Sequence, residues 1–436
     1  MPNSVKDLFS SKWGFIFAAA GSAIGMGNIW LFPYRIGELG GAVFLIPYII
    51  CVAVLGFTAV IGEITIGRLT GTGPVGAFKK ALELRGNKGT IGECFGWFSV
   101  LVVLTISLGY TVVVSWIMRF LTGALTGSAF ITSNSTQYFD LVANNQVLLW
   151  VIMTLVLVGI AMIKGIENGI ERVSKFMIPA FLILFLILVV RVAFLPGAFE
   201  GYKYLFVPRW EFLFNTRTWI FALGQSFYSL SIFGSIMVVY GSYAKKSEDI
   251  VFSARNIVVL DTLASIIASL MIIPAVFAFS KNINAGPSLM FITMPDIFKT
   301  IPFGQVFMII FFTAVFFAAI TSLISILEVV VEAAQSKFKM PRYLAVGTTI
   351  LVAIICNAFI CSNIGRFTDI LEIHFIPFCA LTCGIFIFWI IPSKNVIEEI
   401  QKGHSKSLGN WIIPMGRYVF CSLVILIYIL NILHLK

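Results

Sequence analysis

Charged residues are scarce in this chain. Lys, Arg, Asp and Glu make up 11% of its 436 residues, whereas soluble domains hold about 25%. Histidine occurs three times, and the seven cysteines form no CxxC pair, which leaves little material for a zinc site or a disulfide framework. The HExxH and GxSxG motifs of metalloproteases and serine hydrolases are also missing. These absences argue against a soluble domain and against the common hydrolytic enzymes.

The chain has long hydrophobic runs instead. Hydrophobic residues account for 59% of the sequence, and the runs at 176–195 and 306–333 meet or exceed the roughly 20 residues that a bilayer core requires. We therefore expect an all-α polytopic membrane protein. About eleven spans are predicted, near 13–36, 42–68, 90–124, 146–163, 168–195, 217–241, 250–280, 304–335, 341–360, 367–391 and 411–433.

The net charge of +10 is distributed along the connections between spans. The basic residues form no continuous face of the kind that binds nucleic acid, so we expect no nucleic-acid partner. They concentrate near 68–88, 164–175, 245–246, 337–342 and 394–406, which are alternate connections. The positive-inside rule then predicts a cytoplasmic N-terminus.

Two of the predicted spans contain residues that break helices. The first, "AAAGSAIGMGNIWLFPY" (18–34), has three glycines, an asparagine and a proline, and the sixth, "GQSFYSLSIFGSIMVVYGSY" (224–243), is crowded with Ser, Gly and Tyr. The two spans are five apart, which points to an inverted repeat with a binding site at its centre. We expect one transmembrane domain over 1–436, with repeats at about 13–195 and 217–391 and an extra helix at about 411–433.

Non-helical backbone inside a membrane must be buried in protein or line a wet cavity. Its freed carbonyl oxygens can replace the water shell of a cation, and the N–H groups of the next half-helix can bind a carboxylate. The two breaks together therefore predict a site for a zwitterion with cations beside it. The alternative is that Gly21 and Gly25 form a small-residue packing face, but Asn28 and the matching break in span six favour the site.

Two acidic residues lie within the predicted spans near these breaks. Charged groups at that depth are costly and usually functional, so we expect Glu63 and Asp261 to face the protein interior. Asp261 is the better candidate cation ligand. Thr321 and Ser322 can add hydroxyl ligands, although such a pair in a helix is more often bonded to the preceding turn.

Several motifs in this chain resemble the neurotransmitter:sodium symporter family, whose fold is that of the bacterial leucine transporter. They include "GSAIGMGNIWLFPY", "GGAVFLIPY", "IGEITIGRLTG", "KGIENGIERVSK", "AGPSLMFITMP" and "FFAAITSLIS", in order from about 6 to 392. The resemblance implies a 5+5 inverted repeat with broken helices 1 and 6 plus an eleventh helix. It also implies sodium-coupled transport by alternating access.

The resemblance assigns candidate ligands residue by residue. The first sodium site is expected at Ala23, Asn28, Ser229 and Asp261. The second is expected at Gly21, Ile24, Ala318, Thr321 and Ser322. The substrate pocket is expected to include Ser22, Ala23, Met26, Gly27, Ile106, Tyr110, Tyr228, Ser229, Ser231, Gly234, Ser322 and Ile326.

Three positions set the expected substrate and ion requirements. Gly25 occupies the place where amine transporters of the family carry an Asp, which favours an amino acid that brings its own carboxylate. Asp261 is usually Asn in the family, and chloride-independent members have Glu where this chain has Ser265. We therefore expect Asp261 to supply the fixed negative charge near Tyr48 and Gln225, so that chloride is not required.

The gates of the family are altered in this chain. The Arg of the external gate is Leu31 here, so Arg35 is the candidate partner for Glu372. On the inner side Lys6 matches the family's gating Arg, but the usual Asp falls at Ser336. Glu332 is therefore the candidate substitute.

Gly169 and Pro179 reproduce a Gly-x9-Pro spacing that the family associates with unwinding of span five. Pro removes a backbone donor and Gly loosens the turn, so the chemistry of the two residues agrees with that role. Together with Glu63, these residues are the predicted gating and coupling positions.

We expect a sodium-coupled importer of amino acids in a bacterial inner membrane, not an enzyme. Room beside Gly234 suggests a bulky apolar or aromatic substrate. A proton-coupled permease of the same fold is the main alternative, and a channel is another. The sequence does not identify the amino acid or the oligomeric state.

Overall fold

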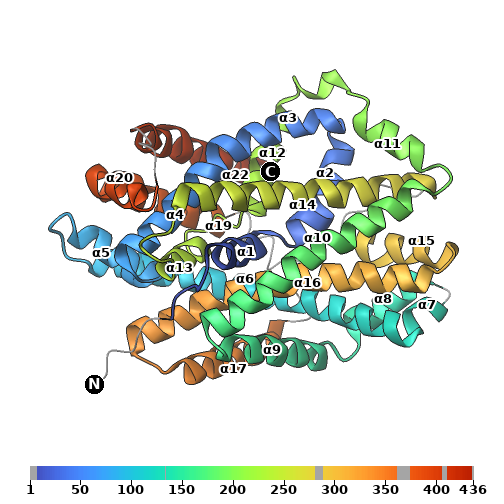
Figure 1. Ribbon diagram of the computed structural model, residues 1–436, viewed down its shortest axis with the longest axis horizontal. Coiled ribbons are helices and arrows are strands. Elements are labelled where there is room, and N and C mark those ends of the chain that lie inside the picture. Colours follow the sequence, from blue (N-terminus) through green and yellow to red (C-terminus); the bar gives the residue numbers. More distant parts are fainter. Residues whose placement is uncertain (1–6, 133, 280–287, 361–373, 405–409, 435–436) are drawn as a thin grey trace.

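The computed structural model describes residues 7–132, 134–279, 288–360, 374–404 and 410–434. Among these residues there are helices and connections but no β-strand. The expectation of an all-α protein is confirmed. In Figure 1 the long helices α10, α14 and α16 run along or obliquely to the long axis of the molecule.

The first half of the chain supplies five spans and their connections. Several spans contain a turn of π-helix, labelled η, that continues directly from an α-helix; η4 is a 3-10 turn. The elements are α1 (Lys12–Ala23), η1 (Gly27–Leu31), α2 (Phe32–Glu38), α3 (Ala42–Cys51), η2 (Val52–Gly56), α4 (Phe57–Thr70), α5 (Pro74–Glu83), α6 (Thr90–Thr126), α7 (Ser128–Ile131), α8 (Ser135–Asn144), α9 (Val147–Ile163), η3 (Ile166–Glu171), α10 (Arg172–Ala193), α11 (Ala198–Phe206) and η4 (Trp210–Phe212).

The second half again begins with a broken span. Its elements are α12 (Thr216–Ser229), α13 (Ile236–Ser242), α14 (Ile250–Ala278), η5 (Leu289–Thr293), α15 (Met294–Thr300), α16 (Gly304–Phe338), α17 (Arg342–Ile360), α19 (Ile376–Ile385), η7 (Phe386–Ile390), α20 (Ser393–Gln401), α21 (Ile412–Pro414), η8 (Met415–Phe420) and α22 (Cys421–His434).

The helices account for the predicted spans. Seven continuous helical segments among the described residues are long and apolar enough to cross a membrane, and three bent pairs bring the number to as many as ten. The first bent pair is the predicted first span, Lys12–Ala23 with Gly27–Glu38, bent by 59°. The remaining predicted span is divided between α12 and α13, which are separated by six residues.

The broken helices lie at the centre of the bundle. The first half-helix α1 packs against α10, α14 and α16, while α13 packs against α4 and α16. Because α1 is buried along nearly its whole length, its break at 24–26 is enclosed by protein. This enclosure is the condition under which a broken helix is tolerated inside a membrane.

At the end that carries α5 and α20, α4 is tied to α20 by a buried ion pair. Arg68 Nε lies 2.9 Å from Glu399 Oε1, and both side chains are fully buried. Burial works against ionisation of Glu399, but hydrogen bonds from Lys402 and Lys246 and the charge of Arg68 hold the pKa of that carboxyl below its usual range. Because the chain bends by 98° before α20, this helix lies across the end of the bundle.

Candidate functional site

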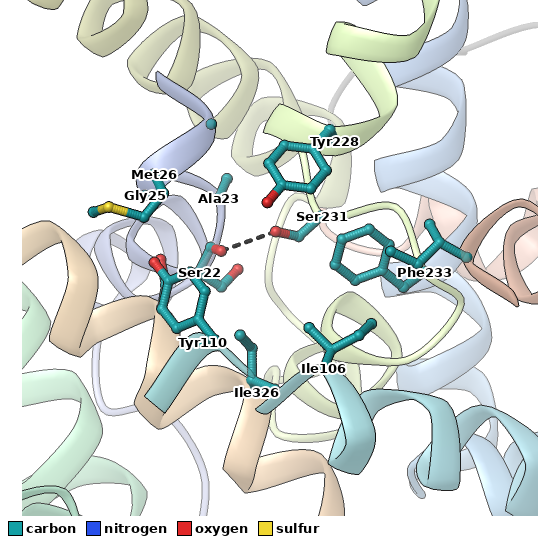
Figure 2. A pocket seen from close by; sticks show the side chains of 13 residues that line it. Ser22, Ala23, Gly25, Met26, Ile106, Tyr110, Tyr228, Ser231, Phe233 and Ile326 are labelled. Atoms are coloured by element: carbon teal, nitrogen blue, oxygen red, sulfur yellow. Dashed lines mark hydrogen bonds between the residues drawn. The ribbon is translucent and has the colours of Figure 1, made fainter. Parts of the chain in front are cut away.

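The two breaks meet at one point. Helix α1 ends at Ala23 and helical structure resumes at Gly27, while α12 ends at Ser229 and α13 begins at Ile236. Ser231 Oγ donates a hydrogen bond of 3.0 Å to the carbonyl oxygen of Ser22, which joins one break to the other (Figure 2). The two broken spans are therefore in direct contact at their breaks.

The first break is stabilised by a hydrogen bond to a side chain of the same span, and it requires a residue without a side chain. Ile24 adopts an extended conformation, with ψ of 107°, which ends the helix. Asn28 Oδ1 accepts a hydrogen bond of 2.9 Å from the backbone N–H of Gly25 and so replaces a lost helical bond. A Cβ on Gly25 would lie 2.8 Å from Tyr110 Oη and 2.9 Å from Ser322 Oγ, so only glycine fits there.

The second break depends on two residues in the left-handed region. Ser231 has φ of +51° and Gly234 has φ of +68°. The N–H of Gly234 donates a hydrogen bond of 2.9 Å to Glu63 Oε1, so the predicted intramembrane acid on α4 does face the interior. Glu63 thus satisfies a backbone donor that the break would otherwise leave unpaired.

A buried polar cluster lies behind the first break and includes three of the four residues predicted for the first sodium site, while the fourth, Ala23, lines the pocket described below. Asn28 Nδ2 donates to Asp261 Oδ1 at 2.7 Å, to Ser229 Oγ at 3.0 Å and to Ser265 Oγ at 2.9 Å. Ser229 Oγ in turn donates to Asp261 Oδ2 at 2.7 Å. The cluster therefore links η1, α12 and α14.

Asp261 has no exposed surface, and no basic side chain pairs with it among the described residues. A buried carboxylate without a counter-charge is costly, and a cation is the group that offsets that cost. The nearby side-chain oxygens are the hydroxyls of Ser229 and Ser265 and the carboxylate of Asp261, the type of ligand that hard cations prefer. The residues present thus fit a small hard cation.

The predicted second sodium site also assembles. Ser322 Oγ donates hydrogen bonds of 3.0 Å to the carbonyl oxygens of both Gly21 and Ile24. Thr321 Oγ1 donates to the carbonyl oxygens of Phe317 and Ala318 on its own helix, each at 3.0 Å. Oxygens of α1 and α16 therefore converge here, but every one of them is neutral.

A pocket of about 60 Å³ lies between the two breaks, α6 and α16 (Figure 2). Its lining comprises Ser22, Ala23, Gly25, Met26, Gly27, Ile106, Tyr110, Tyr228, Ser231, Phe233, Ser322, Ile326 and Ile376. Ten of the twelve predicted pocket residues line it. The other two, Ser229 and Gly234, do not.

The two exceptions have different reasons. Ser229 points into the Asp261 cluster behind the pocket. Gly234 faces away, since a Cβ placed on it would lie 2.7 Å from Cys383 Cβ. The neighbouring Phe233 lines the pocket in its place, so the expected extra room beside Tyr110 is absent.

Ile376 and Gly25 also line the pocket and were not predicted as lining residues. Ile376 is the first residue of α19 and is followed by Pro377. Proline is favoured in the first turn of a helix. That Pro was the available signal in the sequence. Gly25 was considered as part of a packing face and as the site of a missing carboxylate, although its lack of a side chain is what leaves room for Tyr110 and Ser322.

The residues expected near a chloride position form a second polar layer around Asp261. Gln225 Nε2 donates to the carbonyl oxygen of Gly27 at 3.0 Å. The buried Gln225 Oε1 has no hydrogen-bond partner among the described residues, and the buried hydroxyl of Tyr48 lies against Asp261. Ser265 lies one helical turn after Asp261 and receives a hydrogen bond from Asn28.

One predicted gate lies beside a second, larger cavity. This cavity, of about 770 Å³, adjoins the pocket and shares Tyr228 and Ile376 with it. Arg35 lies 3.8 Å from the ring centre of Phe221, which lines the cavity, and 3.3 Å from Glu38. The predicted partner Glu372 lies outside the described residues.

The other predicted gate includes a residue outside the described part of the chain, and a different ion pair lies beside its second member. Lys6 lies outside the described residues, and Glu332 lines a polar cavity of about 540 Å³ together with Asp7 and Ser336. Beside it, Arg342 binds both carboxylate oxygens of the fully buried Glu328, at 2.9 and 3.0 Å.

Helix α13 contacts α16 through two hydroxyl groups. Tyr243 Oη donates a hydrogen bond of 2.9 Å to Glu328 Oε1. One turn earlier, Tyr240 and Ser325 share a hydrogen bond of 2.6 Å. Sequence reasoning missed Glu328, because its partner Arg342 belongs to the next helix.

The Gly-x9-Pro segment begins in a π-helical turn. Gly169 lies in η3 and Pro179 lies inside α10. At the end of η3, Glu171 accepts hydrogen bonds from the N–H of Ser10 at 2.6 Å, from Ser10 Oγ at 2.8 Å and from Ser11 Oγ at 2.9 Å. The start of α1 is thereby attached to the start of the fifth span.

Comparisons with known proteins agree with this geometry. The model of the sodium:neurotransmitter symporter family matches residues 6–140 and 129–436. The chain is 33% identical to an uncharacterized sodium-dependent transporter, YhdH, of Bacillus subtilis, over 91% of this chain and 90% of that protein. It is 27% identical to an uncharacterized sodium-dependent transporter of Haemophilus influenzae, over 98% and 99% of the two chains.

A solved structure is similar along almost the whole length. The crystal structure of MhsT in complex with L-phenylalanine superposes with a TM-score of 0.86 at 30% sequence identity, covering 97% of this chain and 99% of that one. The broken helices, the buried polar cluster and the enclosed pocket therefore occur in a chain whose length, sequence and fold all match one family of membrane transporters. This chain belongs to the sodium:neurotransmitter symporter family.

Proposed function

We propose that this protein imports amino acids with apolar side chains by sodium-coupled alternating access. The observation that carries the proposal is Asp261, a fully buried carboxylate beside the pocket with no basic partner among the described residues. Its hydrogen bonds reach both broken helices through Asn28 and Ser229. A cation bound there compensates a charge that the fold has otherwise left unpaired.

The polar end of the pocket suits the carboxylate of an amino acid. Tyr110 Oη is buried and, together with Ser322 Oγ, borders the space that Gly25 leaves open, since a Cβ on Gly25 would lie 2.8 and 2.9 Å from these two oxygens. The helix formed by η1 and α2 begins at Gly27, so the positive end of its dipole lies at the same place. An amino acid supplies the negative charge that both groups favour.

Coupling follows from shared elements. A sodium ion at the Asp261 cluster orders the two breaks that also form the pocket, which raises the affinity for the amino acid, and the amino acid raises sodium affinity by the same factor. A second sodium ion at Gly21, Ile24, Ala318, Thr321 and Ser322 holds α1 against α16. Its release, favoured by unwinding at Gly169 and Pro179, frees α1 to move. No covalent bond is made or broken.

The remaining sequence predictions complete this proposal. The basic residues of alternate connections support a cytoplasmic N-terminus in an inner membrane. The polar cavity beside Glu332 then faces the cytoplasm, and the cavity beside Arg35 faces outward. Asp261 takes the place of chloride, so chloride is not required for transport.

The lining of the pocket supports an apolar substrate side chain. Apart from its backbone and hydroxyl groups, the pocket presents Met26, Ile106, Phe233, Ile326 and Ile376. L-Phenylalanine, the ligand in the MhsT structure, is an apolar amino acid. The sequence prediction of an especially bulky or aromatic substrate depended on Gly234, which does not line the pocket.

Uptake into proteoliposomes tests the proposal. The protein is supplied with a mixture of the twenty amino acids under an inward sodium gradient, and a potassium gradient of equal size is the control. Sodium-dependent depletion of apolar amino acids is the expected result. Depletion driven by a pH gradient alone would favour the proton-coupled permease, and unitary currents on sodium addition would favour a channel.

A further inference from the structure

The segment between α12 and α13 follows an irregular path that determines which side chain enters the pocket. The N–H of Phe233 donates to the carbonyl oxygen of Ser231 at 2.9 Å, which closes a tight turn. Ser231 and Gly234, on either side of the turn, both have positive φ. As a result the ring of Phe233 points toward the centre of the pocket, facing Ser22 and Tyr110 across it (Figure 2).

The back of this turn is fixed in place. Glu63, 2% exposed, accepts the hydrogen bond from the N–H of Gly234. Behind Gly234, Cys383 and the carbonyl oxygen of Cys379 leave no space, since a Cβ would approach them to 2.7 and 2.9 Å. The turn therefore cannot shift backward, and Phe233 has no place for its ring except the pocket.

The volume that remains is small. A water molecule requires a cavity of about 10–15 Å³. The pocket measures about 60 Å³, well below the roughly 150 Å³ of an engineered apolar cavity that binds benzene. Ile106 and Ile326 form another wall of the pocket, and Ile376 lies on the side toward the larger cavity. Nothing along these walls offers a polar partner to a longer side chain.

We propose that Phe233, positioned by the Glu63–Gly234 hydrogen bond, sets the size limit of the pocket and selects small apolar amino acids of about the size of alanine. This inference rests on the proposed function. Phe233 acts by occupying the space that the side chain of leucine, phenylalanine or tryptophan needs. Glu63 is a positioning residue, because it acts on the substrate only through the turn that carries Phe233.

The test is competition for sodium-driven uptake in proteoliposomes. Radiolabelled alanine is the transported probe, and unlabelled glycine, alanine, leucine, phenylalanine and tryptophan are the competitors. The wild-type protein should be inhibited by alanine at concentrations at least tenfold lower than by phenylalanine. In Phe233→Ala the vacated ring volume should reverse that order, because contacts of a few methylene groups are worth tenfold or more in discrimination.

Phe227→Ala is the matched control. It removes the same ring from the same broken span, but Phe227 lines the larger cavity and stacks on Phe420 instead of lining the pocket. In this variant the ratio of the inhibition constants of alanine and phenylalanine should remain that of the wild-type protein. Phe233→Leu supplies a milder variant that keeps a buried apolar side chain if Phe233→Ala does not fold.

Glu63 is tested by the same ratio of inhibition constants. If Glu63 only stabilised the fold, its substitution would not change this ratio. Glu63→Gln keeps a carbonyl oxygen for the N–H of Gly234 and should retain the preference for alanine. Glu63→Ala removes that acceptor and should bring the inhibition constants of alanine and phenylalanine closer together. Equal ratios in both variants would remove Glu63 from the proposal.

Two outcomes separate this inference from the function on which it rests. A wild-type protein that takes up no amino acid in response to sodium would refute the proposed function itself. A wild-type protein that shows sodium-driven uptake but binds leucine, phenylalanine or tryptophan more tightly than alanine would overturn the size limit alone. An unchanged order of competitors in both Phe233 variants would overturn it as well.

Discussion

The two proposed sodium sites lie on either side of the same break in the first span, yet they are built from different chemistry. The cluster at Asp261 contains a buried carboxylate and hydrogen bonds that join three elements. The site at Ser322 contains only hydroxyl and carbonyl oxygens of α1 and α16. The charged site should therefore bind its ion more strongly, whereas the neutral site should release its ion more readily.

The partners of each site assign them different roles. Through Asn28 and Ser229, the charged cluster holds both broken spans, which also form the pocket, so its ion acts on the substrate. The neutral site joins α1 to the long helix α16, so its ion acts on the position of α1. One site thus serves binding, and the other serves the conformational change.

Asp261→Asn tests the charged site and should have the largest effect. The substitution keeps the shape of the side chain but removes its charge, so we expect the sodium concentration for half-maximal uptake to rise at least tenfold, or about 1.4 kcal/mol. Sodium titration of amino acid uptake measures it. Asp140→Asn, at an exposed carboxylate on α8, is the control, and an unchanged sodium requirement in Asp261→Asn would contradict the assignment.

Restoring a carboxylate one turn away should reverse part of that loss. Ser265 touches the same amide of Asn28, so the double variant Asp261→Asn with Ser265→Glu returns a negative charge to the cluster. Transport by Asp261→Asn should be stimulated by chloride, and the double variant should lose that stimulation. The chloride stimulation is measured as the difference in amino acid uptake between chloride and gluconate buffers at fixed sodium. If transport by the wild-type protein rises with chloride, Asp261 does not replace the chloride charge.

Ser322→Ala tests the neutral site. It removes the hydroxyl that donates to the carbonyl oxygens of Gly21 and Ile24, and the sodium requirement should rise about two- to tenfold, as expected for the loss of one ordinary hydrogen bond. Ser115→Ala is the matched control, because Ser115 is equally buried but bonds only to its own helix. An effect as large as that of Asp261→Asn would erase the difference between the sites.

Thr321→Val should have the smallest effect of the series. The two side chains have the same shape, and the hydroxyl of Thr321 bonds only to carbonyl oxygens of its own helix, so folding should be unaffected. We expect a two- to fivefold rise in the sodium requirement, the cost of one weak neutral ligand. Thr321→Ser should behave as wild type. Thr154→Val, a back-bonded buried threonine on α9, controls for the substitution, and any shift there would discredit the comparison.

The parts of this arrangement that residue type determines were predictable from the sequence. Glycines together with polar residues in the middle of an apolar run favour a break over a packing face, and an acid at that depth is expected to face the interior. The positions of the two breaks follow from those rules, whereas the convergence of Asn28, Ser229 and Asp261 is what the resemblance to the family implies. The bulk of the helical architecture follows from hydrophobic length alone.

The orientation of Phe233 was not predictable, because it depends on backbone dihedral angles. Ser231 has φ of +51°, a conformation that residues other than glycine rarely adopt. This dihedral angle turns the side chains of the following residues away from the directions that an alignment of the sequences assigns to them. Phe233 therefore faces the pocket, whereas the sequence predicted Gly234 there. Similarly, the pairs Arg342–Glu328 and Ser10–Glu171 join separate helices, and no local pattern announces them.

The shared carboxylate of Glu171 has a kinetic consequence. Its side chain binds Ser10 and Ser11 just before α1, while Glu171 itself is the last residue of the π-helical turn η3. Gly14 has no side chain and so leaves the space in which the carboxylate of Glu171 lies. Neither segment can open without breaking hydrogen bonds that belong to the other, so the two should open in one event with one rate. Amide hydrogen exchange at Ser10 and across η3 should accelerate together when sodium is withdrawn, and Glu171→Gln should shorten the lifetime of the closed form in both segments equally.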